Sequence, residues 1–343
     1  MVIDTQTTEQ SQTGNSQPPE RLVSEIEALG QRIAAVREHI GRVIFGQDDV
    51  VEQTLITLLA GGHALLVGYP GLGKTRLVDT LGTVLGLEDR RVQFTPDLMP
   101  PDILGSEVLE EDDSGHRSFR FIKGPIFGSL LMADEINRAS PRTQSALLQA
   151  MQEYKVSVAG QDHDLPKPFH VLATQNPLEL EGTYPLPEAQ LDRFLLQIDV
   201  GYPDEASEKR MLIATTGVAD EKPEQVLTAD ELIAAQRLVR ALPVGDAVAD
   251  AILKLVRAGR PNEHGDPSIR HHLSWGPGPR ASQALMLATR ARAMLQGRFA
   301  PSIDDVITLA PPVLRHRMAL TFSARAEGIT VDGVIDRLCA TLG

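Results

Sequence analysis

The feature that most constrains how this chain folds is the stretch from His63 to Thr75. A short apolar run, Ala64 to Val67, is followed by Gly68-Tyr69-Pro70-Gly71-Leu72-Gly73-Lys74-Thr75. Glycines at this spacing allow a tight backbone turn, so that several N–H groups converge at the start of a helix. The pattern G-x-x-x-x-G-K-T is therefore typical of a P-loop, a phosphate-binding loop between a strand and a helix. We expect Lys74 to reach the outer phosphates and the Thr75 hydroxyl to ligate Mg²⁺.

The residues around this loop support a nucleotide site. Downstream, apolar residues from Leu77 to Leu85 recur at helical spacing until Gly86, which disfavours an accidental glycine-rich turn. Upstream, the apolar turn from Val43 to Asp48 is well placed to wall off an adenine ring, although plain packing explains its composition equally well. The predicted nucleotide contacts are Ile44, Gly46, Gly68, Tyr69, Pro70, Gly71, Leu72, Gly73, Lys74, Thr75 and Arg76.

Composition narrows the class of protein. The 343 residues favour two domains, and the net charge of -13 argues against a nucleic-acid partner, because binding of that kind needs clustered Lys and Arg. The single cysteine, Cys339, excludes an internal disulfide and favours a reducing compartment. No apolar run approaches the roughly 20 residues of a membrane span, and the N-terminus lacks a signal-peptide pattern. We therefore expect a soluble, cytoplasmic protein.

The pattern along the chain predicts three regions. Residues 1–19 are rich in Thr, Gln, Ser and Pro and predict a disordered tail. Residues 20–202 contain alternating helix and strand signals, which predict an α/β nucleotide-binding domain with a parallel sheet. Residues 203–343 lack strand signals and predict a small all-helical domain, with helix starts at Thr228, Asp246, Ser302 and Thr330.

A second chemical landmark is the apolar run from Leu130 to Ala133, which ends in Asp134 and Glu135. Two carboxylates at the end of a buried strand are costly unless they face a cation and solvent. About sixty residues after a P-loop, this arrangement predicts Asp134 as a direct or second-sphere Mg²⁺ partner. Glu135 is then expected to orient and deprotonate the attacking water.

Three further features have open interpretations. Asn176, at the end of the strand from His170 to Thr174, could contact the γ-phosphate or the water, or could simply mark an Asn-Pro turn. Arg280 lies in the first turn of a helix, where a cation opposes the helix dipole and needs an anionic partner. His271 and His272 lie on a polar loop and lack further metal ligands at close spacing.

Two segments predict hairpins inserted into the α/β domain. One lies between Ile103 and Ile122, on both sides of an acidic turn from Glu110 to Gly115, and the other between Lys155 and Asp164. Inserted hairpins are usually peripheral, and exposed loops commonly carry contacts to partners.

Together these features resemble an AAA+ ATPase, and within that superfamily the chain resembles the MoxR group closely. The matching strings are Phe94-Thr95-Pro96-Asp97-Leu98-Met99-Pro100, Gly124-Pro125-Ile126-Phe127, Asp134-Glu135-Ile136-Asn137-Arg138-Ala139, Ala173-Thr174-Gln175-Asn176-Pro177 and Glu188-Ala189-Gln190-Leu191-Asp192-Arg193-Phe194. The resemblance covers residues from about 20 to 343 and implies an AAA+ core followed by a helical lid.

The resemblance also implies roles for individual residues. It makes Asn176 the sensor 1 residue, Arg193 an arginine finger that reaches a neighbour's nucleotide, and Arg280 the sensor 2 residue. Gly278 departs from the pattern, since a serine is usual before the Pro-Arg pair. The two hairpins correspond to inserts that face the substrate side of a ring.

The function implied by the resemblance is ATP hydrolysis, with Mg²⁺, by a homo-oligomeric, hexameric ring. Its expected output is chaperone-like remodelling or maturation of a client protein complex, often with a partner that carries a von Willebrand A domain. A magnesium-chelatase-like subunit, a DNA-complex motor and a small-molecule phosphotransferase are the alternatives. The acidic balance argues against the DNA motor, and a phosphotransferase does not need Arg193 or a lid with Arg280.

Overall fold

The computed structural model describes residues 19–111, 116–178, 181–217, 222–262 and 265–342. The disordered tail predicted for residues 1–19 therefore lies outside the described residues, except that Pro19 begins the first helix, α1 (Pro19–Gly41). The turn of the first hairpin, at residues 112–115, also lies outside them.

A five-stranded parallel sheet forms the centre of the molecule. Its strands lie in the order β2 (Asp89–Gln93), β5 (Leu130–Asp134), β8 (His170–Gln175), β1 (Ala64–Gly68) and β9 (Leu196–Val200). Because all five strands run in one direction, their carboxyl ends meet at one edge. This edge brings together the P-loop after β1, the acidic pair after β5 and Asn176 after β8.

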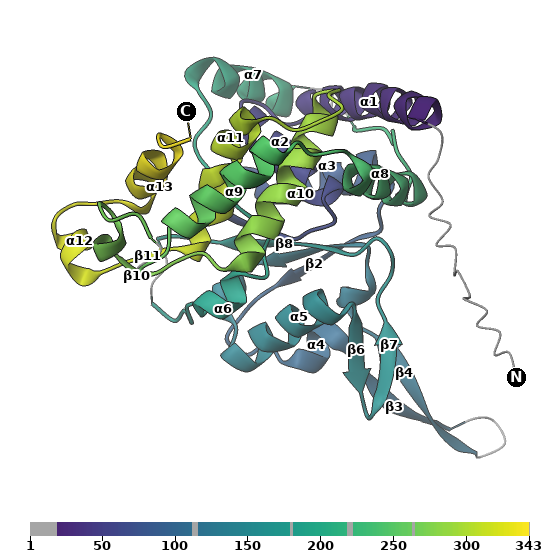
Figure 1. Cartoon of the computed structure of the whole chain (residues 1–343). Coiled ribbons are helices and arrows are strands. Elements are labelled where there is room, and N and C mark those ends of the chain that lie inside the picture. Colours follow the sequence, from purple (N-terminus) through teal and green to yellow (C-terminus); the bar gives the residue numbers. More distant parts are fainter. Residues whose placement is uncertain (1–18, 112–115, 179–180, 218–221, 263–264, 343) are drawn as a thin grey trace, which may run out of the picture.

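Successive strand residues face two separate hydrophobic cores, as the period of two in a β-strand requires. Leu65 belongs to one core together with residues of α4 (Pro100–Leu104) and α5 (Pro141–Glu153). Leu66 belongs to the other, together with residues of α2 (Asp48–Leu59) and α3 (Lys74–Val84). Helices therefore cover both faces of the sheet, which confirms the predicted α/β class (Figure 1).

Two hairpins extend from this core at the lower right of Figure 1. They are β3 (Gly105–Glu111) with β4 (Arg117–Lys123), and β6 (Lys155–Val158) with β7 (Gln161–Asp164), each antiparallel. The side chains of Phe121 and His163 stack with ring centroids 4.0 Å apart, so the two hairpins contact each other. Both hairpin predictions are confirmed.

The C-terminal part is mainly helical. Its helices are α7 (Glu205–Thr216), α8 (Ala229–Ala241), α9 (Asp246–Ala258), α10 (Pro279–Leu295), α11 (Ile303–Leu314), α12 (Phe322–Ala326) and α13 (Val331–Cys339). Thr228 accepts a hydrogen bond from the backbone N–H of Glu231 and Thr330 one from that of Gly333, so two of the predicted helix starts are capped as expected.

One expectation for this region is wrong, because it also contains strands. β10 (Leu273–Trp275) pairs in antiparallel fashion with β11 (Ala319–Leu320). Strands of three and two residues are too short to give a periodic signal in sequence. The remaining short elements are α6 (Glu188–Leu191) and the 3₁₀ turns η1 (Pro125–Phe127), η2 (Ile136–Arg138), η3 (Arg270–His272) and η4 (Arg315–Arg317).

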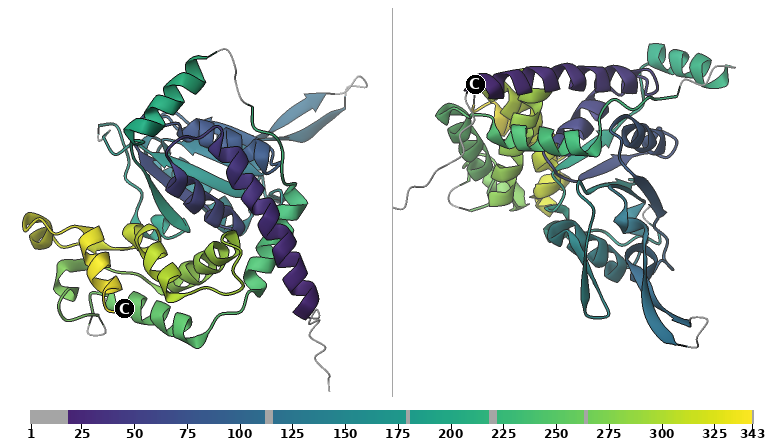
Figure 2. Two further views of the ribbon diagram at one scale, coloured as in Figure 1. Left: turned by 90° about the horizontal axis from the view of Figure 1, so that it is seen from above. Right: turned by 90° about the vertical axis from the view of Figure 1, so that its right-hand side faces the viewer.

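The N-terminal helices contact the lid as well as the sheet domain. Figure 2 shows α1 along one side of the molecule, where it lies against both α3 and the lid helix α10. The Arg292 guanidinium of α10 pairs with Glu52 of α2 at 3.2 Å and with the fully buried Asp305 of α11 at 2.6 Å. The domain boundary placed after residue 202 stays a prediction. Among the described residues, no helix combines the length and the apolar character that crossing a bilayer requires.

Candidate active site

The P-loop adopts a conformation that depends on its glycines. Gly71 has φ +82° and Gly73 has φ +75°, both in the left-handed region that side chains rarely adopt. Gly73 immediately precedes α3, so the loop ends at a helix N-terminus, where N–H groups point outward. The Lys74 ammonium donates hydrogen bonds to the carbonyl oxygens of Gly68 (2.8 Å) and Tyr69 (2.7 Å).

A cavity of about 440 Å³ opens between this loop and the carboxyl ends of the strands. Its lining residues are Pro70, Gly71, Leu72, Gly73, Lys74, Thr75, Arg76, Arg91, Asp134, Glu135, Thr174 and Asn176. Burial lowers the pKa of Lys74, while the charges of Asp134 and Glu135 act in the opposite direction. Among the predicted contacts, Gly68 and Tyr69 do not line this cavity and instead hold Lys74 through their carbonyl groups.

Asp134 lies at the cavity wall with both carboxylate oxygens engaged. Oδ1 accepts a hydrogen bond from the Thr174 hydroxyl at 2.5 Å, and Oδ2 pairs with the Arg91 guanidinium at 2.6 Å. Thr75 lines the same cavity. A hydroxyl and a carboxylate are hard oxygen donors of the kind that Mg²⁺ prefers, so these two residues fit the predicted metal.

Glu135 is held by several contacts in an unusual backbone conformation. Its φ of +54° is in the left-handed region, and its N–H donates to the Thr174 hydroxyl at 2.9 Å. Its carboxylate Oε2 accepts from the Gln93 amide at 2.8 Å and from the Arg138 guanidinium at 3.1 Å. A non-glycine residue in this region is strained and needs such support.

Asn176 supports the turn after β8, one of the two roles left open by its sequence, and it also lies at the cavity, so contact with phosphate or water stays a prediction. It is largely buried and lines the cavity beside Glu135 and Thr174. Its Oδ1 also accepts a hydrogen bond from the N–H of Leu178 at 3.1 Å, so the same side chain supports the turn after β8.

A second cavity, of about 250 Å³, continues from the first, because both are lined by Pro70 to Gly73 and by Arg76. Ile44 and Phe45 form part of its wall, with Met211 and Thr215 of α7. The Gln47 amide donates to the carbonyl oxygen of Leu72 at 2.9 Å, which ties this wall to the P-loop. A mainly apolar hollow next to a phosphate-binding loop suits a nucleotide base.

Gly46, predicted as a nucleotide contact, does not line this second cavity. It has φ +66°, and a Cβ added to it would lie 2.4 Å from the Cβ of Ser207 in α7. Its role in the structure is therefore to let the turn approach α7 closely.

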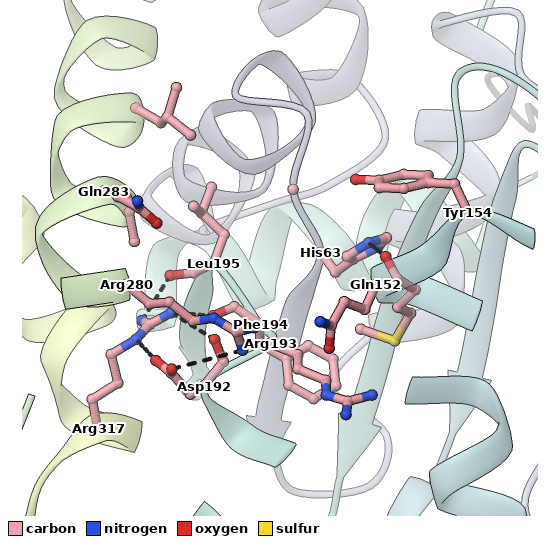
Figure 3. Close-up of a pocket in the computed structure, with 14 residues that line it drawn as sticks. His63, Gln152, Tyr154, Asp192, Arg193, Phe194, Leu195, Arg280, Gln283 and Arg317 are labelled. Atoms are coloured by element: carbon pink, nitrogen blue, oxygen red, sulfur yellow. Dashed lines mark hydrogen bonds and ion pairs between the residues drawn. The ribbon is translucent and has the colours of Figure 1, made fainter. Parts of the chain in front are cut away.

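Arg193 and Arg280 lie elsewhere, in a third cavity of about 250 Å³ (Figure 3). Neither lines the phosphate cavity of its own chain. The Arg280 guanidinium approaches the Asp192 carboxylate at 3.9 Å. Burial lowers the pKa of Arg193, and the charge of Arg280 lowers it further. The charge of Glu153 acts in the opposite direction on the pKa of Arg193.

Among the described residues, His271 and His272 belong to no group that could hold a metal ion. Their rings are 3.8 Å apart, and the described part of the chain contains no group of three or more His, Cys, Asp or Glu residues that could hold a metal ion.

Comparison with known proteins agrees with this geometry. Residues 63–196 match the model of the "ATPase family associated with various cellular activities (AAA)", and residues 268–338 match the AAA lid domain. The chain is 42% identical to Chaperone MoxR1 of Mycobacterium tuberculosis, over 94% of this chain and 84% of that protein. It belongs to the MoxR family of AAA+ ATPases.

Other relatives agree with this assignment. Protein MoxR of Methylorubrum extorquens is 32% identical to this MoxR-family chain, over 84% of this chain and 88% of that protein. The crystal structure of a candidate ATPase from Cytophaga hutchinsonii superimposes with a TM-score of 0.87 at 34% identity, over 94% of this chain and 97% of that one. The chain is therefore a nucleotide-binding ATPase with an AAA+ core and a helical lid.

Sequence reasoning gave no role to four residues that contact the acidic pair, namely Arg91, Gln93, Arg138 and Thr174. Arg91 and Gln93 are two apart in β2, and residues at this spacing face the same side of a sheet. Thr174 is two residues before Asn176. The spacing of two residues was therefore visible in the sequence. It points to the acidic pair only once β2 and β8 are known to lie on either side of β5.

Proposed function

We propose that this MoxR-family ATPase works as a homo-oligomeric ring, a hexamer, in which each ATP is hydrolysed between two subunits. The observation that carries the proposal is the separation of cationic groups within one chain. Lys74 lines the phosphate cavity, whereas Arg193 and Arg280 line another. A ring of identical subunits can bring the second group of one chain to the phosphates of the next.

The residues of the phosphate cavity then have separate roles in ATP hydrolysis. Lys74 and the loop N–H groups bind the phosphates, and Glu135 takes the proton of the attacking water, which Asn176 orients. Thr75 and Asp134 would hold Mg²⁺, which when bound would supply positive charge against the phosphates. Arg193 of the neighbour stabilises the transition state, a contribution of roughly 10³- to 10⁵-fold in other systems.

We further propose a chaperone-like output, the remodelling or maturation of a client protein complex, with a von Willebrand A domain protein as partner. The name of the relative Chaperone MoxR1 supports the chaperone role. The exposed side chains of Leu109 and Phe119 on the first hairpin suit contact with protein, and the net charge of -13 disfavours nucleic acid. The lone, buried Cys339 suits the cytoplasm, where we place the protein.

The first test separates binding from chemistry. Lys74→Ala should lose ATP binding, because the charge that pairs with the phosphates is removed. Glu135→Gln should bind ATP with an affinity similar to that of the parent and hydrolyse it at least about 100-fold more slowly, since the proton acceptor is lost. Fluorescent-nucleotide titration and steady-state phosphate release measure the two effects. Glu135→Gln protein that hydrolyses ATP at the parent rate would contradict the assignment.

The second test asks whether Arg193 acts across subunits. Arg193→Ala protein should bind ATP and turn it over slowly. Lys74→Ala protein retains a functional Arg193, so mixing the two should restore part of the turnover. Stable mixed rings without any recovery would show that Arg193 does not act on a neighbour's nucleotide.

A further inference from the structure

Arg317 of η4 is the largest fully buried side chain among the described residues, with only 2% of its surface exposed. A guanidinium has five N–H donors, and all of them have acceptors here. Nε donates to the Asp192 carboxylate at 2.7 Å. The other four bonds go to the backbone carbonyls of Val313 (2.6 Å), Phe194 (2.6 Å), Leu195 (3.1 Å) and Asp192 (3.3 Å).

Four of these five bonds reach one short segment, Asp192 to Leu195, which precedes β9. Arg193 is the second residue of this segment, and carbonyl groups on both sides of it, those of Asp192 and Phe194, accept hydrogen bonds from Arg317. The neighbouring His316 donates from Nε2 to the Phe194 carbonyl at 3.1 Å. Burial and the charge of Arg317 lower the pKa of His316, so this ring stays neutral.

This arrangement is more than a generic hydrophobic anchor between lid and core. Burial of a cation is costly, and a well-packed apolar side chain fills the same space at lower cost. A guanidinium, in contrast, fixes several carbonyl groups at once in a rigid fork. Figure 3 shows Arg317 on one side of the cavity, bonded to Asp192, with His63 and Tyr154 on the opposite side.

We propose that Arg317 is a positioning residue: it fastens the segment that carries Arg193 to the lid of the same chain, so that the lid and Arg193 move together. The inference rests on the proposed function, because it assumes that Arg193 serves a neighbouring subunit. It adds to that function a coupling from the lid of one subunit to the site of the next. Movement of one subunit's lid changes the position of the guanidinium that it presents to the next subunit.

The test uses Arg317→Lys, which keeps the charge but replaces five donors in a fork with three at one point. We expect kcat for ATP to fall about 10- to 100-fold, because misplacement of a catalytic group by about 1 Å has costs of this size. KM and ATP binding should stay within about twofold, since the phosphate cavity is untouched.

Arg315→Gln is the matched control. Arg315 also lies in η4 and joins the lid to the core through Asp199 of β9 at 2.7 Å, and it pairs with Asp332 of α13, within the lid, at 2.8 Å. Neither carboxylate belongs to the segment from Asp192 to Leu195. Its kcat should stay within about twofold of the parent value.

Subunit mixing distinguishes positioning from a general loss of structure. Arg317→Lys subunits keep an intact phosphate cavity, and Lys74→Ala subunits keep a well-placed Arg193. In an equal mixture, about one quarter of the interfaces combine the two intact parts, so turnover should recover to about a quarter of the parent value. Mixing Arg317→Lys with Arg193→Ala subunits should give no recovery, because both lack a functional Arg193.

The outcomes separate this inference from the proposed function. In one outcome, turnover recovers when Arg193→Ala is mixed with Lys74→Ala but not when Arg317→Lys is mixed with Lys74→Ala. This result would leave the ring mechanism intact and overturn the role of Arg317. Parent-like kcat of Arg317→Lys, or loss of its ATP binding, would also overturn that role. Failure of both mixtures would overturn the ring mechanism and this inference with it.

Discussion

At the scale of single residues, Thr174 connects the two acidic side chains of the site. Its hydroxyl donates to Asp134 Oδ1 and accepts from the N–H of Glu135. One hydroxyl thus orients the proposed metal ligand and supports the left-handed backbone of the proposed base. Asn176, two residues further along, was predicted from the sequence because an amide at the end of a strand is typical of a nucleotide site. A buried threonine, in contrast, is common in any strand.

We predict that Thr174→Val, which is nearly isosteric, lowers kcat for ATP about tenfold. Loss of the hydroxyl leaves the part-buried Glu135 N–H without this acceptor; for a fully buried group such a loss typically costs about 1–3 kcal/mol of stability, which is an upper bound here. Thr57→Val is the control, since the Thr57 hydroxyl donates to the Gln53 carbonyl within its own helix, away from the acidic pair. Phosphate-release assays and urea unfolding of both variants provide the measurements. An unchanged kcat for Thr174→Val would refute the bridging role.

At the scale of elements, two buried histidines join the amino ends of β1 and β8. His63 Nδ1 accepts from the N–H of Val171, and His170 Nδ1 donates to the Gly62 carbonyl at 2.8 Å. Gln236 of α8 donates to His170 Nε2 and to the Leu58 carbonyl, which extends the contact to the lid. Burial lowers the pKa of His63 to about 3 and that of His170 to about 4.

These values predict how stability depends on pH. Both pKa values lie below the ordinary 6.5, so the unfolded chain binds protons that the native chain does not. The contribution of the two neutral histidines to the free energy of unfolding is therefore fully present above pH 6.5. It falls as the pH drops toward 4, by roughly 1.4 kcal/mol per pH unit for each histidine. In urea unfolding between pH 7.5 and 5.0, His170→Gln should lose less stability than the parent. The exposed control His271→Gln should follow the parent, and equal slopes in all three proteins would refute the prediction.

At the scale of the whole molecule, the proposed division of the site between two chains would make activity depend on assembly. We predict that turnover per subunit rises with protein concentration until the rings are complete, because an isolated chain lacks a neighbour's Arg193. Dilution series with parallel light scattering would relate activity to mass. If turnover per subunit stayed constant while the rings dissociated, the result would contradict a site shared between chains.

The sequence predicted local features better than long-range ones. The P-loop, the acidic strand end, the hairpins and two capped helix starts depend on neighbours within a few residues, so their patterns were sufficient. The placement of Arg280 beside Arg193 depends on how the lid packs, which no local pattern encodes. Arg317 lies in the string Arg315-His316-Arg317, which suggests a basic surface turn, yet tertiary contacts bury it almost completely.

The strand order has a consequence for how the protein is made. β1 pairs only with β8 and β9, whose residues follow it by more than one hundred positions. During synthesis the P-loop strand therefore leaves the ribosome long before its partners exist, and such non-local pairing is slow to form. A nascent chain that ends before residue 170 contains Lys74 and Thr75 but not the sheet that supports them, so the ability to hold nucleotide arises late in translation.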